Sequence, residues 1–309
     1  EAPTGQKPVE EAAEDDDDDK DVMTFEANTA STVTKAVNEA VKHIITIMNN
    51  CTQKDTTVTI RDVNIDVSKG YRPAMIVVGE GDTTLKLEGD NTLKSGMRCA
   101  GLEKDDEGST GKLTITAEDT SSSLNAYGGL YGAGIGGGYH QSTSNLEIAN
   151  GKIHAVGGNF GAGIGGGHSG NGEVSISGGE VTAQGGLYAA GIGGGAAGSG
   201  KVTIKNGEVT AKGGKGNSSG GAGAAIGTGG DADGKAGKEL DVNVSGGGTV
   251  TRINSQLTSD CKHEWILVSS TPAAVGQQGE KSMNVLLAAP QGLYTSLHFL
   301  HLWRSRTAG

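Results

Sequence analysis

The sequence predicts an all-β chain that winds into a stacked solenoid, or β-helix. The first observation is composition: 55 of 309 residues are glycine and only 4% are aromatic, which does not describe a core of large interdigitated side chains. The second is the stretch LYGAGIGGGYH at 130–140, which returns as NFGAGIGGGHS from Asn159 and LYAAGIGGGAA from Leu187. The third is the alternation in segments such as EVSISGGEVTAQGG, which is typical of half-buried strands. Collagen is excluded because glycine does not recur at every third position.

Residues 1–21 form a strongly acidic segment, with ten acidic residues and two lysines. Such a run cannot bury enough apolar surface to fold, so we expect a disordered leader or linker. Its DDDDDK sequence also resembles an enteropeptidase site, so an added tag is the alternative. The rest of the chain is only mildly acidic, which disfavours nucleic acid as a partner. No run of about 18 apolar residues predicts membrane insertion.

Residues 22–50 are predicted to hold a capping α-helix. Apolar residues recur there at intervals of three and four, with Thr29 or Ser31 as N-cap and the Asn-Asn pair at 49–50 as its end. The helix would cover the first coil of the solenoid. The apolar positions are Val33, Val37, Ala40, Val41, Ile44, Ile45 and Met48.

Residues 51–254 are predicted to form about six to seven coils. The isoleucines of the GIGGG segments and of the weaker copy AAIGTGG serve as anchors: Ile135, Ile164, Ile192 and Ile226 are 29, 28 and 34 residues apart. The last interval is long because KGNSSG at 215–220 is interpreted as an inserted loop. Each period holds three short strand candidates, which fits a solenoid, whereas a propeller blade needs four strands. Upstream, Leu102 marks a degenerate copy.

Equivalent residues of successive coils should stack about 4.8 Å apart, as neighbouring strands do. The inward positions then form aliphatic columns that fill a narrow interior. The predicted columns are Leu113, Leu146, Val174, Val202 and Val242; Ile115, Ile148, Ile176, Ile204 and Val244; Leu124, Ile153, Val181 and Val209; Ala126, Ala155, Ala183 and Ala211; and the four anchors.

Glycines flank the first three anchors on both sides, as Gly134 and Gly136 do around Ile135. The alternation predicts that these glycines point outward and form a face without side chains. Two interpretations remain open. Either something approaches the backbone closely there, or the corners require positive φ, which glycine tolerates.

The unit xVTIxGGxVTAxGGxxGAGIGGG resembles the glycine-rich right-handed β-helix repeats of large secreted and surface proteins of Gram-positive gut bacteria. The resemblance covers roughly Thr56 to Asn254. It implies a right-handed winding and extracellular display, and polysaccharide-binding and pectin-processing β-helix families supply the analogy for function. Fold alone does not determine function.

Residues 255–309 are predicted to form a tail of uncertain structure. CKHEW at 261–265 is similar to the start of Cys/His/Trp modules that follow such domains, but no second cysteine comes after it. Cys51, Cys99 and Cys261 form no CxxC pair, and their odd number leaves at least one unpaired within the chain.

Tyr131, Phe160 and Tyr188 each lie four residues before an anchor. They are candidate ligand-binding residues, because a column of rings can stack on sugars. Their parity matches the anchors, so a structural aromatic stack, inward or at a corner, is the competing interpretation. His140 and His168 follow GGG segments and are interpreted as solvated turn residues.

Glu180 and Glu208 occupy equivalent positions beside Lys152, and His154 lies on the same outward face. The two glutamates could share a cation or act as an acid–base pair; the simpler interpretation is exposed charges at strand starts. Between Cys99 and Thr251 there is no arginine, and between Ser121 and Gly230 there is no aspartate. These absences disfavour a polysaccharide lyase of pectate-lyase-like fold.

GDADGKAG at 230–237 resembles the beginning of a Ca²⁺ loop, with Asp231 and Asp233 as candidate ligands. The later bidentate acid is missing, so a polar Asp/Gly turn is the simpler interpretation, and no cofactor is predicted.

Together these patterns predict a non-catalytic, secreted or cell-surface module for adhesion or carbohydrate binding, with a polysaccharide, host glycan or surface protein as partner. A structural stalk is the alternative.

Overall fold

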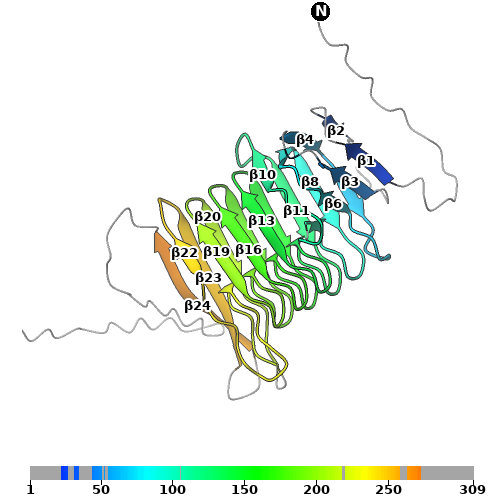
Figure 1. Ribbon diagram of the computed structural model, residues 1–309. Coiled ribbons are helices and arrows are strands. Elements are labelled where there is room, and N and C mark those ends of the chain that lie inside the picture. The colour runs from blue at the N-terminus through cyan, green and yellow to red at the C-terminus, as the bar shows by residue number, and fades with distance from the viewer. Residues whose placement is uncertain are drawn as a thin grey trace, which may run out of the picture.

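The chain coils into a parallel β-solenoid of about six turns, seen here in a computed structural model (Figure 1). The structure describes residues 22–26, 31–34, 44–50, 52, 55–104, 106–217, 220–257 and 263–272. Successive turns stack from one end of an elongated body to the other, and each full turn supplies one strand to each of three sheets. Within each sheet, strands of successive turns pair in parallel, apart from one antiparallel pair at the C-terminal end.

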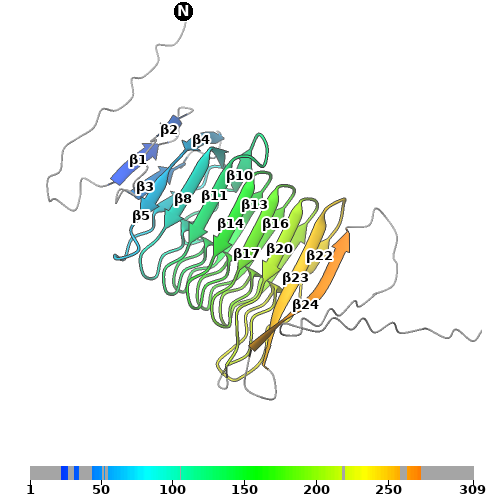
Figure 2. The ribbon, with the colours of Figure 1, turned by 180° about the vertical axis from the view of Figure 1, so that it is seen from behind.

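The three sheets, A, B and C, have eight strands each. Sheet A contains β1 (Val22–Glu26), β3 (Ile44–Met48), β6 (Met75–Val78), β9 (Leu102–Glu103), β12 (Ile135–Gly136), β15 (Ile164–Gly165), β18 (Ile192–Gly193) and β21 (Ile226–Gly227). Sheet B contains β2 (Ser31–Thr34), β4 (Thr56–Arg61), β7 (Thr83–Glu88), β10 (Leu113–Ala117), β13 (Thr143–Ile148), β16 (Gly172–Ile176), β19 (Gly200–Ile204) and β22 (Val242–Val244). Sheet C, which faces the viewer in Figure 2, contains β5 (Asn64–Asp66), β8 (Asp90–Lys94), β11 (Ser123–Tyr127), β14 (Lys152–Val156), β17 (Glu180–Gln184), β20 (Glu208–Lys212), β23 (Thr249–Leu257) and β24 (His263–Pro272).

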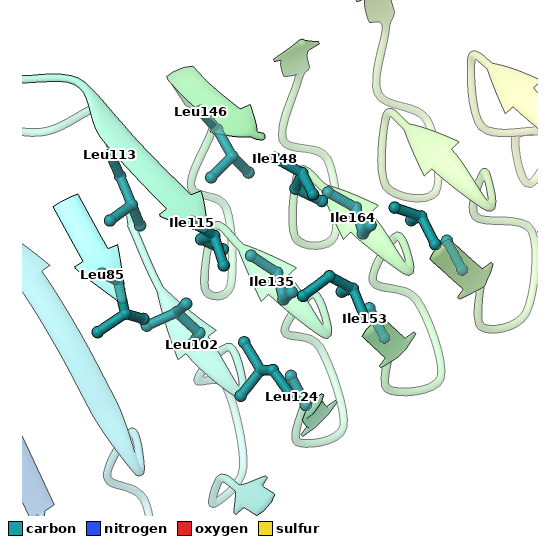
Figure 3. Close-up of a cluster of buried hydrophobic side chains, with 14 of the residues drawn as sticks. Leu85, Leu102, Leu113, Ile115, Leu124, Ile135, Leu146, Ile148, Ile153 and Ile164 are labelled. Carbon is teal, nitrogen blue, oxygen red and sulfur yellow. The ribbon is translucent and has the colours of Figure 1, made fainter. Parts of the chain in front are cut away.

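The predicted columns are confirmed residue by residue. The four anchors pair in register along sheet A, and Leu102 stands in register before Ile135. The two columns of sheet B and the two of sheet C pair in the same way. Their side chains meet in the interior between the three sheets (Figure 3), where Leu113, Ile135 and Ile153 are at most 1% exposed. Aliphatic ladders thus replace an aromatic core.

The predicted capping helix at 22–50 is not supported. Its described residues form β1, β2 and β3, and no described residue of the chain is helical; residues 35–43, which carried part of the helical pattern, lie outside the described residues. In β3 the side chains of Ile45 and Ile47 are buried and stand in register with Met75 and Val77 of the next coil. The run IITIM fits both periodicities, but its β-branched residues favour a strand once a neighbouring strand is available to pair with it.

The C-terminal edge of sheet C is closed by β24, which pairs antiparallel with β23. This pair begins at Thr249, in register with Glu208 of β20. The predicted tail, residues 255–309, therefore begins inside β23, and the strand pair ends the parallel stacking on this face. Residues 1–21 and 273–309 lie outside the described residues.

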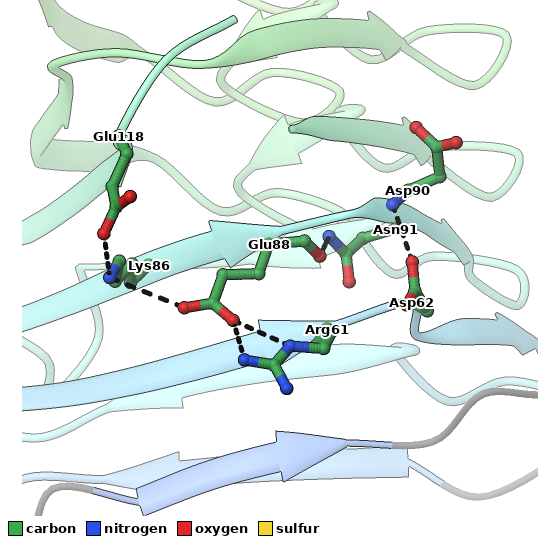
Figure 4. A network of polar contacts seen from close by, with 7 residues as sticks. All are labelled: Arg61, Asp62, Lys86, Glu88, Asp90, Asn91 and Glu118. Atoms are coloured by element: carbon green, nitrogen blue, oxygen red, sulfur yellow. Dashed lines mark hydrogen bonds and ion pairs between the residues drawn. The ribbon is translucent and has the colours of Figure 1, made fainter. Parts of the chain in front are cut away.

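Ion pairs link neighbouring coils on the outside of sheet B (Figure 4). Arg61 Nε donates to Glu88 Oε2 at 2.7 Å, and Lys86 Nζ lies 2.9 Å from Glu118 Oε1. The Arg61 guanidinium holds the pKa of the Glu88 carboxyl below its usual value. Exposed pairs of this kind contribute little to stability, so they mark the solvent face of sheet B.

The flanking glycines serve both functions that the sequence left open. Gly136, Gly165 and Gly193 have φ of 130°, 135° and 129°, a region that L side chains rarely adopt. Gly134 and Gly163 have no such φ, but a Cβ on either would lie 2.6 Å from a backbone atom of the next coil. Only glycine fits at both kinds of position.

Candidate functional site

Two tight loops flank each anchor, one before it and one after it. The residue four positions after each anchor donates a hydrogen bond from its backbone N–H. The acceptor is a backbone carbonyl in the preceding coil, four positions before that coil's own anchor, or before Leu102 in the earliest coil. The donors and acceptors are Tyr139 to Arg98 (2.7 Å), His168 to Tyr131 (2.9 Å), Ala196 to Phe160 (2.9 Å) and Gly230 to Tyr188 (2.6 Å). This hydrogen-bond ladder joins the two rows of loops along the stack.

The predicted glycine face is therefore not open. Gly134, Gly136, Gly163 and Gly165 are all buried, because the loops before and after them are bonded to each other. The outer surface on this side of the solenoid consists of the loop tips. Alternation along the strand predicted an open face and could not predict that the chain folds back over these glycines.

Six aromatic rings gather at these loop tips, and we call them the aromatic ridge: Tyr131, Tyr139, His140, Phe160, His168 and Tyr188. Tyr131 stacks on Phe160 with ring centroids 5.5 Å apart and planes 12° from parallel, and Phe160 lies 5.8 Å from Tyr188. His168 packs edge-on against Tyr131 and Phe160 at 5.7 and 5.3 Å. His140 is exposed and the other five are partly exposed. The predicted column of Tyr131, Phe160 and Tyr188 thus lies at a corner. It forms one row of rings before the anchors, and Tyr139 and His168 form a second row after them.

Tyr139 is a residue that the sequence interpretation missed. It lies four residues after Ile135, at the position that His168 occupies after Ile164, and the two rings stack 5.6 Å apart. Its ring also lies 4.8 Å from Tyr131. Counting four residues on both sides of each anchor would have identified it.

Several residues of the loop tips adopt a backbone conformation that is unfavourable for side chains. Arg98, His140 and Tyr188 have φ of 73°, 62° and 64°, and Ser169 and Ala197, which are equivalent to His140, have φ of 60° and 61°. Non-glycine residues with positive φ persist only where the surroundings enforce them, and they cluster at functional sites. The loop tips are thus held in one shape by the cross-coil hydrogen bonds.

The pKa of one ridge histidine, His168, is shifted by its surroundings. Burial lowers the pKa of His168, and the neighbouring His140 lowers it further; the two rings are 5.4 Å apart. The neutral form of His168 is therefore favoured at the ridge.

Sheet C carries a hollow of about 330 Å³, apart from the aromatic ridge. It includes two of the predicted candidates, His154 and Glu180, and an ion pair of 3.0 Å joins Glu180 to Lys152. Glu208 pairs in register with Glu180 but lies outside the hollow. The lining residues are Asp90, Ser121, Ser123, Asn125, Lys152, Ile153, His154, Glu180 and Thr182.

Asp231 and Asp233 lie in a turn that the Asp231 side chain organises. Asp231 Oδ1 accepts hydrogen bonds from the backbone N–H groups of Asp233 at 3.1 Å and Lys235 at 2.9 Å. Glu239 pairs with Arg252 at 2.7 Å instead of approaching this loop. Over the described residues, no three His, Cys, Asp or Glu side chains gather as a metal site would require. The geometry matches a polar turn.

Cys99 is a free thiol at the base of the loops, and burial raises its pKa to about 12. A thiol with so high a pKa is a poor nucleophile. Cys51 and Cys261 lie outside the described residues. Within the described ranges, no helix has the length and hydropathy needed to cross a membrane.

A β-helix repeat family model matches residues 120–139, 146–168 and 174–196. These segments contain three of the four anchors and five of the six ridge rings, and they lie in successive turns of the solenoid. The chain contains a parallel β-helix repeat domain. Neither the curated proteins nor the solved structures that were compared include a match.

Proposed function

We propose that this β-helix domain is a non-catalytic module for carbohydrate binding and adhesion, and that the aromatic ridge is its binding surface. The observation that carries the proposal is the set of six partly to fully exposed rings on the loop tips of three successive coils. The C–H faces of sugars pack on aromatic faces, and Tyr and His add polar atoms at the ring edge. Coil spacing supports a linear ligand, because successive tips repeat about every 4.8 Å, close to the length of one sugar in an extended chain.

The rigidity of the loop tips also supports a binding role. The cross-coil hydrogen bonds hold the rings in place before a ligand arrives, which reduces the conformational entropy lost on binding. The sheet C hollow supports catalysis less well, because Lys152 neutralises Glu180. As parts of the same proposal, the winding is right-handed and the module is displayed by a Gram-positive bacterium, secreted or at the cell surface.

A structural stalk is the second candidate, and the mutual packing of the ridge rings favours it. Tyr188 is partly covered, since a Cβ on Gly220 would meet its ring at 2.5 Å, and Phe160 contacts three other rings. On this view the rings stabilise the coil and bind nothing.

A glycan array separates the two candidates. The wild-type protein should bind at least one extended glycan, and Tyr139→Ala should weaken that binding by about tenfold or more. Tyr127→Ala is the matched control, because Tyr127 lies partly exposed on sheet C, beside His154 rather than on the ridge. Silence of the wild-type protein on plant, mucin and bacterial glycans, with a lowered melting temperature for Tyr139→Ala, would establish the stalk instead.

A further inference from the structure

The first row of the ridge continues into the two coils that precede it. Met75, Leu102 and Ile135 pair in register along sheet A. The residue four positions before Leu102 is Arg98, and four before Met75 is Tyr71. Equivalent positions on the loop tips of five successive coils are therefore occupied by Tyr71, Arg98, Tyr131, Phe160 and Tyr188.

Arg98 is built into this column in the same way as the aromatic residues. Its carbonyl accepts a hydrogen bond from Tyr139 N–H at 2.7 Å. The carbonyls of Tyr131 and Phe160 accept the equivalent hydrogen bonds from the coils that follow them. Its guanidinium lies over the Tyr139 ring, 5.3 Å from the centroid. Stacking on a ring orients a guanidinium while leaving its N–H edge free for a planar anion.

The Arg98 guanidinium is available for a ligand. Its side chain is exposed, and it has no ion-pair or hydrogen-bond partner within the described part of the chain. Lys69 and Arg72 add positive charge on the neighbouring loop tip, where both are exposed. The carboxylate of Glu103 is directed inward, where it accepts a hydrogen bond from Ala100 N–H at 2.9 Å. Three cationic side chains thus lie at this end of the ridge, although the whole chain carries a charge of −11.

Exposed apolar side chains lie beside this positive charge. Three large hydrophobic side chains are exposed among the described residues, and two of them, Tyr71 (69%) and Met97 (36%), lie on the tips next to Arg98. Exposed apolar groups around a single oriented cation are typical of a surface that binds a ligand with both apolar and anionic parts.

We propose that the ridge selects glycans that carry carboxylates, and that Arg98 is the residue that determines this specificity. The sugar faces stack on Tyr131, Tyr139 and Phe160, while a carboxylate one coil away accepts two parallel hydrogen bonds from the Arg98 guanidinium. The ligand chain runs along the solenoid axis, across the loop tips. The inference rests on the proposed glycan-binding function and names the ligand class for it.

The test compares hyaluronate, alginate and polygalacturonate with their methyl esters, which keep the backbone and remove the charge, and includes dextran sulfate and dextran. We expect at least one carboxylated polymer to bind more tightly than its ester. Arg98→Gln should reduce that binding by about tenfold and abolish the preference over the ester, and Arg98→Lys should restore it in part. The hydrogen bond from Tyr139 N–H is accepted by the main-chain carbonyl of residue 98, so both variants keep it.

Arg61→Gln is the matched control, since it removes the same charge from the outer face of sheet B (Figure 4) and should bind as the wild type does. Equal binding of acids and esters, or of Arg98→Gln and wild type, would overturn the role of Arg98 while leaving glycan binding in place. Preference for dextran sulfate over every carboxylated polymer would overturn the carboxylate assignment. Failure of all these polymers, together with a silent glycan array, would overturn the proposed function itself.

Discussion

Replacing Gly165 with alanine tests why the repeats are so rich in glycine. Gly165 has φ of 135°, and a Cβ on it would lie far inside van der Waals contact with Gly193 O of the next coil. The unfavourable backbone costs about 1–2 kcal/mol, and forcing an extra carbon into a packed site adds about 1–3 kcal/mol. We therefore expect Gly165→Ala to lower the free energy of unfolding by about 2–5 kcal/mol.

Two other glycines separate the two contributions. Gly234 has φ of 81° but open space around its missing Cβ, so Gly234→Ala reports backbone strain alone. Gly163 lacks a positive φ, but its Cβ would lie 2.6 Å from Gln184 N, so Gly163→Ala reports close approach alone. Urea unfolding followed by circular dichroism measures all three variants at equal m-value. If Gly165→Ala costs no more than Gly234→Ala, the coils do not approach as closely as the structure requires.

Three further predictions concern the core, the ridge and the free thiol. Ile164→Ala should cost about 2–5 kcal/mol in urea unfolding and Ile164→Val about 0.5–1.5 kcal/mol, because the side chain is fully buried; equal costs would contradict the interior column. The lowered pKa of His168 means that folding favours its neutral form, so its stabilising effect is complete above the unfolded value near pH 6.5 and is lost as pH falls toward the folded pKa. The wild-type urea midpoint should thus fall more steeply than that of His168→Gln between pH 7.5 and 5, and parallel curves would refute this. With Cys51 and Cys261 replaced by serine, Cys99 should react with iodoacetamide at pH 8 far more slowly in the folded protein than in urea, because its pKa is raised to about 12; equal rates would show that the thiol is not held as described.

The interior of this protein was predictable from sequence because its side chains repeat in a fixed register. Ile135, Ile164 and Ile192 mark one position in three coils, and a strand period of two then places every inward neighbour. The first coil was not predictable in this way. Its residues at 44–48 carry no GIGGG segment, and a short apolar run fits a helix as well as a strand until Met75 and Val77 are known to lie beside it.

The candidate site was predicted only in part. Tyr131, Phe160 and Tyr188 could be aligned by their common distance from the anchors, but parity along a strand does not apply in a tight loop, so their exposure could not be derived. Tyr139 and Arg98 lie at the same four-residue distance, from Ile135 and Leu102, but their contacts could be found only when the coils were stacked, because each contacts a residue more than five positions away in sequence.

Local sequence alone determined the repeating strands, the aliphatic columns and the places where glycine recurs, because each depends on the properties of single residues and on a short period. Tertiary structure decided what those glycines make possible. With no Cβ in the way, the loops on both sides of each anchor close over it and bond to the preceding coil. The segment LYGAGIGGGYH therefore hides its glycines and exposes its tyrosines, since hydrogen bonds between coils are formed by residues about one full repeat apart.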